Sequence, residues 1–328
     1  MHRYAMKAAG RSRAQMKDRI KKFDALGITP AVELHLAGLD DILEGASDIK
    51  RNCLEYKDCE YIVHMPVTDA RSGYIFDMYN DESFNLKRAF DLCNGIKSRT
   101  LVLHRCFGFD MGLDRFRSEK GFFEKVVKWD ALAKEHGIKV LFENYGFVWL
   151  PEGLGKEFIV SALDHFFPWE IKAFSDNLHR YGLDNTGVLL DTAHMAISSN
   201  MFNVLKTLPG MKQDGRFKSI CEDDLERTDW LKIKDFIFDL VGHFHISDSF
   251  VWGRADGTSD MRKFLYSEGL PVGKGNIDFD GIFKGITGDK MFIMEIEPED
   301  GDYNNNVAQM EAVKNFMRMF GRRAGACV

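Results

Sequence analysis

Short apolar runs alternate along this chain with longer segments in which apolar residues recur every three or four positions. Buried parallel strands read as near-continuous apolar runs, and recurrence at three and four residues is typical of amphipathic helices. Their alternation predicts repeated βα units and a parallel sheet. Eight such repeats fit a closed (β/α)8 TIM barrel better than an open sheet. The predicted strands are residues 3–9, 31–36, 60–65, 100–106, 139–143, 187–192, 241–247 and 291–296.

A single domain over residues 1–328 accounts for the whole pattern, because no repeat, low-complexity tract or Pro/Ser-rich linker interrupts it. The intervals 144–190 and 192–244 are longer than a minimal barrel needs, and they carry additional helical pattern at 205–212 and 230–240. They predict extended loops after the fifth and sixth strands, which either cover the substrate or only decorate the barrel. The other main helices are predicted at residues 12–26, 85–96, 121–135 (ended by a glycine stop at residue 137) and 307–320.

The composition is that of an ordinary globular protein. The formal charge is −6, hydrophobic residues make up 45% of the chain and charged residues 29%, and no basic cluster marks a nucleic-acid groove. The six cysteines are scattered without a C-x-x-C pair, which favours a reducing compartment over a disulfide framework or a zinc ribbon. No apolar stretch approaches the roughly 18 residues of a membrane span, and the first residues lack the apolar core of a signal peptide. We therefore expect a cytoplasmic protein with no membrane partner and no nucleic-acid partner; homo-oligomer formation stays open.

Six of the apolar runs end in an imidazole or a carboxylate. Such a group in a buried strand is costly unless it is paired or bound to a metal, and one rim of a (β/α)8 barrel builds its active site. Six of them at the same end of successive strands predict one site around a divalent cation. These residues are His64, His104, Glu143, Asp191, His245 and Glu295.

Four of these side chains form a coherent ligand set. Glu143, Asp191, His245 and Glu295 offer three carboxylates and one imidazole. An oxygen-rich shell of this kind favours Mn, Mg, Co or Fe(II) over a structural zinc site. Three carboxylates around a divalent cation leave the site negative, which suits a neutral polyol or carbonyl substrate. We expect one divalent metal ion (Mn, Mg, Co or Zn) and no organic cofactor. Since side chains alternate along a strand, Glu297 shares a face with Glu295.

Seven short motifs, each in register with a predicted strand or its loop, carry a family resemblance. They are VHMP, LVLH, FEN, LLDTAH, HFHISDS, VGKGNIDF and MEIE. With them the chain resembles, over about residues 15–320, the xylose isomerase-like barrel superfamily, which includes sugar isomerases and epimerases and the endonuclease IV type of DNA-repair enzyme. The resemblance implies one metal bound by Glu143, Asp191, His245 and Glu295.

The resemblance also distinguishes the branches of that superfamily. It implies that His194 contacts substrate or, in the nuclease branch, another zinc. His64 and His104 lie where that branch holds a second zinc, although epimerase-like members also carry histidines there. The nuclease branch has Asp-x-His just before its Gly-x-Gly segment, where this chain has SEGLP at residues 267–271. The third zinc thus loses two ligands. This loss and the acidic net charge both argue against DNA cleavage.

In the ketose-epimerase branch, two metal-bound glutamates also serve as acid and base. Glu143 and Glu295 fit these roles. A cation that chelates a carbonyl acidifies the neighbouring C–H, because it stabilises the developing enediolate oxygen. One glutamate removes that proton and the other returns one to the opposite face. The branch also places an arginine after the metal-bound histidine to hold a substrate oxygen, and Arg254 is the candidate here.

Other residues near the rim have two interpretations each. Trp252 follows the seventh strand, where an aromatic ring either stacks on a sugar or packs under a long loop. His35 is either a rim residue or a packing residue, and His243 is expected lower in the barrel than His245. The segment around Lys274 lacks the Walker spacing, so it starts the last βα unit, with Lys274 a minor candidate for a substrate phosphate.

We therefore expect a divalent-metal-dependent isomerase or epimerase of a sugar, polyol or keto-sugar derivative, working by proton transfer. Its expected substrate contacts are His64, His104, His194, Arg254 and Trp252. The first alternative is a metal-dependent hydrolase or lyase of the same superfamily, such as an endonuclease IV-like DNA-repair enzyme or an enzyme that cleaves a sugar conjugate. The second is a barrel that keeps the metal site but works as a subunit or binding protein. Salt-dependent binding to DNA would distinguish a nuclease from an epimerase.

Overall fold

The strands close into a barrel, as the sequence predicts. The computed structural model describes residues 2–66, 68–69, 74–75, 82–104, 119–144, 168–207, 241–251 and 267–324. Within them, eight strands close a barrel in the order β1-β10-β9-β8-β7-β6-β3-β2, and all neighbouring strands run parallel. The predicted (β/α)8 fold is therefore confirmed. The barrel strands are β1 (Arg3–Ala9), β2 (Ala31–His35), β3 (Glu60–His64), β6 (Thr100–His104), β7 (Lys139–Glu143), β8 (Thr186–Asp191), β9 (His243–Ile246) and β10 (Met291–Met294).

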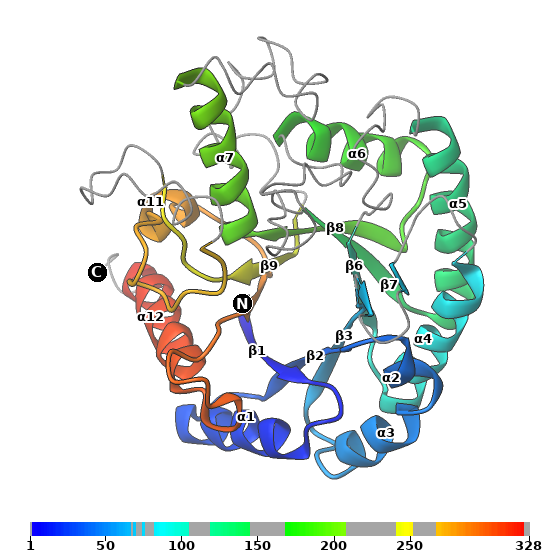
Figure 1. Cartoon of the computed structure of the whole chain (residues 1–328), viewed down its shortest axis with the longest axis horizontal. Helices are drawn as coiled ribbons and strands as arrows, with labels where there is room; N and C mark the ends of the chain where they lie inside the picture. Colours follow the sequence, from blue (N-terminus) through cyan, green and yellow to red (C-terminus); the bar gives the residue numbers. More distant parts are fainter. Residues whose placement is uncertain are drawn as a thin grey trace, which may run out of the picture.

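Helices surround the barrel on its outer side (Figure 1). They connect successive strands, so that each strand returns to the sheet parallel to the one before it. A two-stranded antiparallel hairpin, β4 (Thr68–Asp69) and β5 (Tyr74–Ile75), follows β3 outside the barrel. The helices are α1 (Arg13–Leu26), α2 (Leu39–Leu43), α3 (Ala46–Leu54), α4 (Ser83–Ile96), α5 (Glu119–His136), α6 (Pro168–Arg180), α7 (Thr192–Thr207), α11 (Phe279–Phe283) and α12 (Val307–Ala324), with a 3-10 turn η4 (Tyr303–Asn305).

Local sequence signals set the ends of several elements. The Ser12 side chain caps the first turn of α1, and Gly27 ends this helix in the left-handed conformation with φ 66°. Gly137 follows the last residue of α5 with φ 65°, so the predicted glycine stop is confirmed. The last barrel strand is shorter than predicted: β10 ends at Met294. Glu295 therefore lies one residue beyond the strand, at the rim.

Side chains alternate between two environments along each barrel strand. The outward set packs beneath the helices in the main core, with Phe142, Phe244 and Phe292 among its largest members. The inward set starts with an apolar plug that fills the lower barrel. In the seven strands that contribute to the plug, the inward side chain two residues beyond the last plug member is polar, at the carboxyl ends where active sites of this fold lie. The plug consists of Ala5, Ala31, Ile62, Val102, Leu141, Leu189, Met291 and Ile293.

The extended loops predicted after the fifth and sixth strands fall mostly outside the described residues. Their described parts are α6 and α7. The helical pattern predicted at 205–212 begins within α7 and then leaves the described part, and the pattern at 230–240 lies wholly outside it. None of the helices in the described part combines the length and apolarity needed to cross a bilayer.

Candidate metal centre at the mouth of the barrel

A layer of polar side chains lies directly above the apolar plug. Inward side chains recur at every second residue of a strand. The inward side chain at or near the carboxyl end of each barrel strand belongs to this layer. The layer is continuous around the barrel, because β1 and β10 are paired. In strand order from β1 to β10, its members are Lys7, Glu33, His64, His104, Glu143, Asp191, His245 and Glu295.

Four members of this layer converge on one point. Glu143, Asp191, His245 and Glu295 each offer an atom to a group whose atoms all lie within 4.8 Å of one another. The Nδ1 atom of His245 is 2.9 Å from Oε1 of Glu143 and 2.7 Å from Oε2 of Glu295. Three of the four are fully buried, and Glu295 remains slightly exposed. The structure thus brings together the four side chains that the sequence predicts as metal ligands.

The chemistry of this group fits a divalent cation. Three carboxylates repel one another in a buried site unless positive charge lies between them. Burial raises the pKa of Asp191 to about 7, and the charges of Glu143 and Glu295 add to the rise while His194 opposes it. Burial disfavours the charged form of His245, but the carboxylates of Glu143 and Glu33 outweigh it and raise its pKa well above the usual value. Three hard oxygen donors and one imidazole match the ligand preferences of Mn, Mg or Co, and also of catalytic zinc.

Asn144, which follows β7 in the FEN motif, ties this strand end to the next one. Its side-chain Oδ1 accepts from the backbone N–H of Asp191 at 2.6 Å, and its Nδ2 donates to the carbonyl of Asp191 at 3.2 Å. Its own carbonyl lies 3.0 Å from Nδ1 of His194. The Asp191 carboxylate in turn accepts from the backbone N–H of His194 at 2.6 Å. The two motifs FEN and LLDTAH are therefore one hydrogen-bonded unit.

His64 and His104 lie beside the second oxygen of Glu143. The distance from Oε2 of Glu143 is 2.9 Å to Nε2 of His64 and 3.3 Å to Nε2 of His104. The other nitrogen of His64 donates to the carbonyl of Met65 at 2.9 Å. These two imidazoles therefore face the centre, where they could hold a substrate oxygen. His64 also forms, with Glu143 and His245, a group whose ligand atoms lie close enough together to hold a cation.

His194, in the first turn of α7, faces the segment that replaces the nuclease motif. Its Nε2 is 3.6 Å from Oε1 of Glu268, in the SEGLP stretch. The segment lacks the Asp-x-His pair, but it places one carboxylate, that of Glu268, near His194. Its neighbourhood is fixed by Asp248, whose carboxylate accepts from the backbone N–H groups of Gly273, Gly275 and Ile277.

Residues of β1 and β2 complete the site, and the sequence did not single them out as ligands. Glu33 is fully buried and contacts His245 and His35. Lys7 donates to Oε1 of Glu295 at 3.1 Å and to Oε1 of Glu297 at 3.0 Å. Burial opposes a charged ammonium, yet these two carboxylates raise the pKa of Lys7 above its ordinary value. The signal for Glu33 was a charged residue inside an apolar run, AVELH.

The structure shows where His35, His243 and Lys274 lie, which the sequence left open. His35 is a rim residue, because its ring stacks on His64 with centroids 4.3 Å apart and its Nε2 is 3.6 Å from Glu295. His243 lies lower than His245, since it pairs in register with Met291 and Leu189 of the apolar plug. Lys274 is exposed and pairs with the exposed Glu299 at 3.2 Å.

Two expected substrate contacts, Trp252 and Arg254, lie outside the described residues. Nothing in the described part therefore tests their roles.

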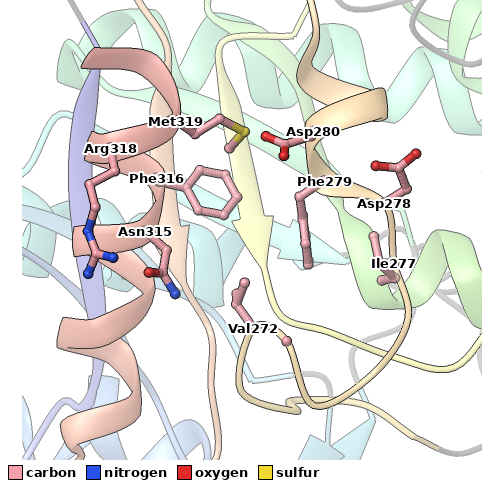
Figure 2. A pocket seen from close by; sticks show the side chains of 10 residues that line it. Val272, Ile277, Asp278, Phe279, Asp280, Asn315, Phe316, Arg318 and Met319 are labelled. Carbon is pink, nitrogen blue, oxygen red and sulfur yellow. The ribbon is translucent and has the colours of Figure 1, made fainter. Parts of the chain in front are cut away.

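A cavity of about 410 Å³ lies on the outer side of the barrel, between α12 and the segment that leads into α11. Figure 2 shows Phe316 of α12 and Phe279 of α11 on its two sides, with ring centroids 5.6 Å apart. Its polar residues are Asp278, Asp280, Asn315 and Arg318, and none belongs to the polar layer. We therefore place the chemistry at the barrel mouth and not in this cavity.

Comparison with known proteins agrees with the fold. The family model described as xylose isomerase-like TIM barrel matches residues 31–318. No protein among those with curated functions matches the chain.

Solved structures similar to this chain include epimerases and an endonuclease-type protein. D-allulose 3-epimerase from Methylomonas sp. is 15% identical, with a TM-score of 0.58 over 95% of this chain and 98% of that one. L-ribulose 3-epimerase is 14% identical, with a TM-score of 0.58 over 99% and 97% of the two chains. AP endonuclease, family 2, from Brucella melitensis is 15% identical, with a TM-score of 0.57 over 95% and 99%. At these identities the likeness extends to the fold alone.

Proposed function

The chain belongs to the xylose isomerase-like TIM barrel family, and on that premise we propose that it is a divalent-metal-dependent isomerase or epimerase of a sugar, polyol or keto-sugar derivative. The observation that carries the proposal is the position of two glutamates. Glu143 and Glu295 come from different parts of the barrel, β7 and the end of β10, and both reach Nδ1 of His245. A pair of carboxylates that flank one centre is what proton removal and return require.

The ligands of the metal would be Glu143, Asp191, His245 and Glu295. When bound, the ion would polarise a substrate carbonyl and so acidify the adjacent C–H. The protein's own residues carry out the proton transfer to and from the substrate carbon. One glutamate accepts the proton from the substrate carbon. The other would enter this step carrying a proton taken from solvent, donate it to the opposite face and be left ionised.

The two glutamates have different surroundings, which supports different roles for them. The carboxylate of Glu143 is fully buried among imidazoles: burial opposes its ionisation, but His245 and His104 lower its pKa well below the usual value. The carboxylate of Glu295 is partly exposed and accepts from Lys7. Lys7 thereby fixes one oxygen of Glu295 and leaves the other directed at His245. His64, His104 and His194 line the same centre and are the proposed contacts to substrate hydroxyls, together with Arg254 and Trp252.

An epimerase is favoured over an endonuclease IV-like hydrolase by the rim next to His194. There the chain offers one half-exposed carboxylate, Glu268, in place of Asp-x-His. Solved structures of sugar epimerases among those similar to the chain add support. A carbohydrate is therefore the proposed substrate.

The test is turnover of a ketose and polyol panel by the protein reconstituted with Mn²⁺, Mg²⁺, Co²⁺ or Zn²⁺, run in deuterated water. The proposal expects metal-dependent conversion of at least one sugar, with deuterium incorporated at the carbon that changes configuration. Direct hydrogen transfer without exchange would refute the two-glutamate mechanism. Cleavage of abasic-site DNA, with no sugar converted, would favour the hydrolase.

A further inference from the structure

Glu33 is a carboxylate in the middle of a buried strand, with each of its oxygens turned to a different imidazole. Its side chain is fully buried. Oε2 is 3.0 Å from Nε2 of His245, and Oε1 is 2.7 Å from Nε2 of His35. Because a buried, unpaired carboxylate would cost several kcal/mol, these two contacts offset the cost of burying Glu33 in β2.

The contact with His245 determines which nitrogen of that ring is directed at the centre. A carboxylate accepts hydrogen bonds and donates none when ionised. Each oxygen of Glu33 lies within hydrogen-bond distance of one imidazole nitrogen, so the carboxylate accepts from both rings. The proton of the Glu33–His245 bond therefore lies on Nε2. The opposite nitrogen, Nδ1, is the one that lies 2.9 Å from Glu143 and 2.7 Å from Glu295.

We propose that Glu33 is the positioning residue for His245: it holds the proton on Nε2 and so leaves the Nδ1 lone pair for the metal. The proposal rests on the metal site of the proposed function. Histidines that ligate metals nearly always donate their other N–H to a carboxylate, carbonyl or water. Glu33 holds His35 by its other oxygen, which aligns that ring on His64 at the rim.

A second buried carboxylate offers a matched control. Asp130 of α5 is buried and accepts at 2.9 Å from the backbone N–H of Asn185 and at 2.8 Å from the hydroxyl of Thr186. These partners lie at the start of β8, at the opposite end of the strand from Asp191. Loss of Asp130 should therefore destabilise the barrel without acting on the metal ligands.

The first measurement is the affinity for Zn²⁺ and Mn²⁺, by competition with a chelator, in wild type, Glu33→Ala, Glu33→Gln and Asp130→Asn. Loss of such a supporting carboxylate typically lowers metal affinity about 10–100-fold, and we expect this for Glu33→Ala. Glu33→Gln should stay within a few-fold of wild type, since its amide oxygen still accepts from Nε2–H. Asp130→Asn should bind metal as wild type does. Equal affinity of Glu33→Ala and wild type, or an equal loss in Asp130→Asn, would overturn the proposal.

The second measurement needs no variant and covers the case in which Glu33→Ala does not fold. In the Zn²⁺-loaded wild-type protein with ¹⁵N-labelled histidine, the imidazole nitrogen shifts show which atom of His245 is protonated. We expect a hydrogen-bonded Nε2–H and a metal-bound Nδ1; a metal-bound Nε2 would overturn the proposal. If wild type binds neither metal, the proposed function loses its metal site. If wild type binds metal and Glu33→Ala binds it equally tightly, only this inference is refuted.

Discussion

Replacement of Lys7 by methionine should destabilise the metal-free protein far more than the metal-loaded one. In the wild type, the ammonium lies 3.1 Å from Glu295 and 3.0 Å from Glu297. At an effective dielectric constant of about 20, a contact of this length is worth about 5 kcal/mol before desolvation is counted. The contact to Glu297 is largely screened, because that side chain is 41% exposed. Removal of one partner of a buried pair typically costs about 3–5 kcal/mol. Because Lys7 and Glu295 keep 23% and 14% exposure, we expect the lower end of that range, about 3 kcal/mol.

A bound divalent cation would supply the charge that Glu295 loses in Lys7→Met. The loss of stability should then fall to about 1 kcal/mol, and by linkage the variant should bind the metal more tightly than wild type. The difference of about 2 kcal/mol corresponds to a gain in affinity of about 30-fold, since 1.4 kcal/mol is tenfold.

The assay is urea denaturation of wild type and Lys7→Met, once with EDTA and once with excess Mn²⁺. Lys290→Met is the matched control: this buried lysine donates to the carbonyl of Val241 at 2.7 Å and belongs to no part of the polar layer. Its loss should cost the same with and without metal. A Lys7→Met variant that loses the same free energy in both conditions would refute the electrostatic argument.

Further predictions concern the catalytic pair, the link between strands, and pH. Glu143→Gln and Glu295→Gln should each lower turnover about 10²–10⁴-fold, whereas Glu297→Gln, which also contacts Lys7, should stay within a few-fold; a near-active Glu295→Gln would contradict its role. Asn144→Ala removes two hydrogen bonds to the backbone of Asp191 and should cost about 1–3 kcal/mol in denaturant melts, with weaker metal binding; unchanged metal affinity would contradict the link. The pKa of Glu33 is lowered from 4.5 to about 2, so its stabilising contribution is present above about pH 4.5 and is lost as the pH falls toward 2. In EDTA, the free energy of unfolding of Glu33→Gln should therefore fall less than that of wild type between pH 4.5 and pH 2. If the free energies of the two proteins fall in parallel, the lowered pKa of Glu33 is contradicted.

The barrel was predictable because strand and helix periods are strongly separated in this chain. Short runs such as LVLH and VLFE recur between longer helical segments, and every barrel strand falls on a predicted one. The ends of the runs also predicted the converging side chains, since parallel strands bring all their carboxyl ends to one rim. What the sequence alone could not specify were the distances that make a site from those ends.

Two residues of the polar layer, Lys7 and Glu33, could not be predicted as part of the site from the sequence. Lys7 lies in RYAMKAA, where polar and apolar residues mix and no terminal charge stands out. Glu33 lies inside the run AVELH and not at its end, so it lacks the strand-end position that marks the other predicted ligands. Both became visible only when the closed barrel paired β1 with β10 and brought the inward side chain of Glu33 to His245 across the barrel interior. Arg254 and Trp252 lie outside the described residues, so their roles stay predictions.

The pairing of β1 with β10 has a consequence for the order of events as the chain is synthesised. Glu143 and Asp191 leave the ribosome long before Glu295, which follows the last strand to be made. Until β10 inserts between β1 and β9, the carboxylates already made face an open sheet, without the second glutamate and with Lys7 at an unpaired edge. At the proposed metal site, tight capture of the ion should therefore wait until β10 is in place. A nascent chain stalled before residue 291 should not retain the ion, however well its first strands have folded.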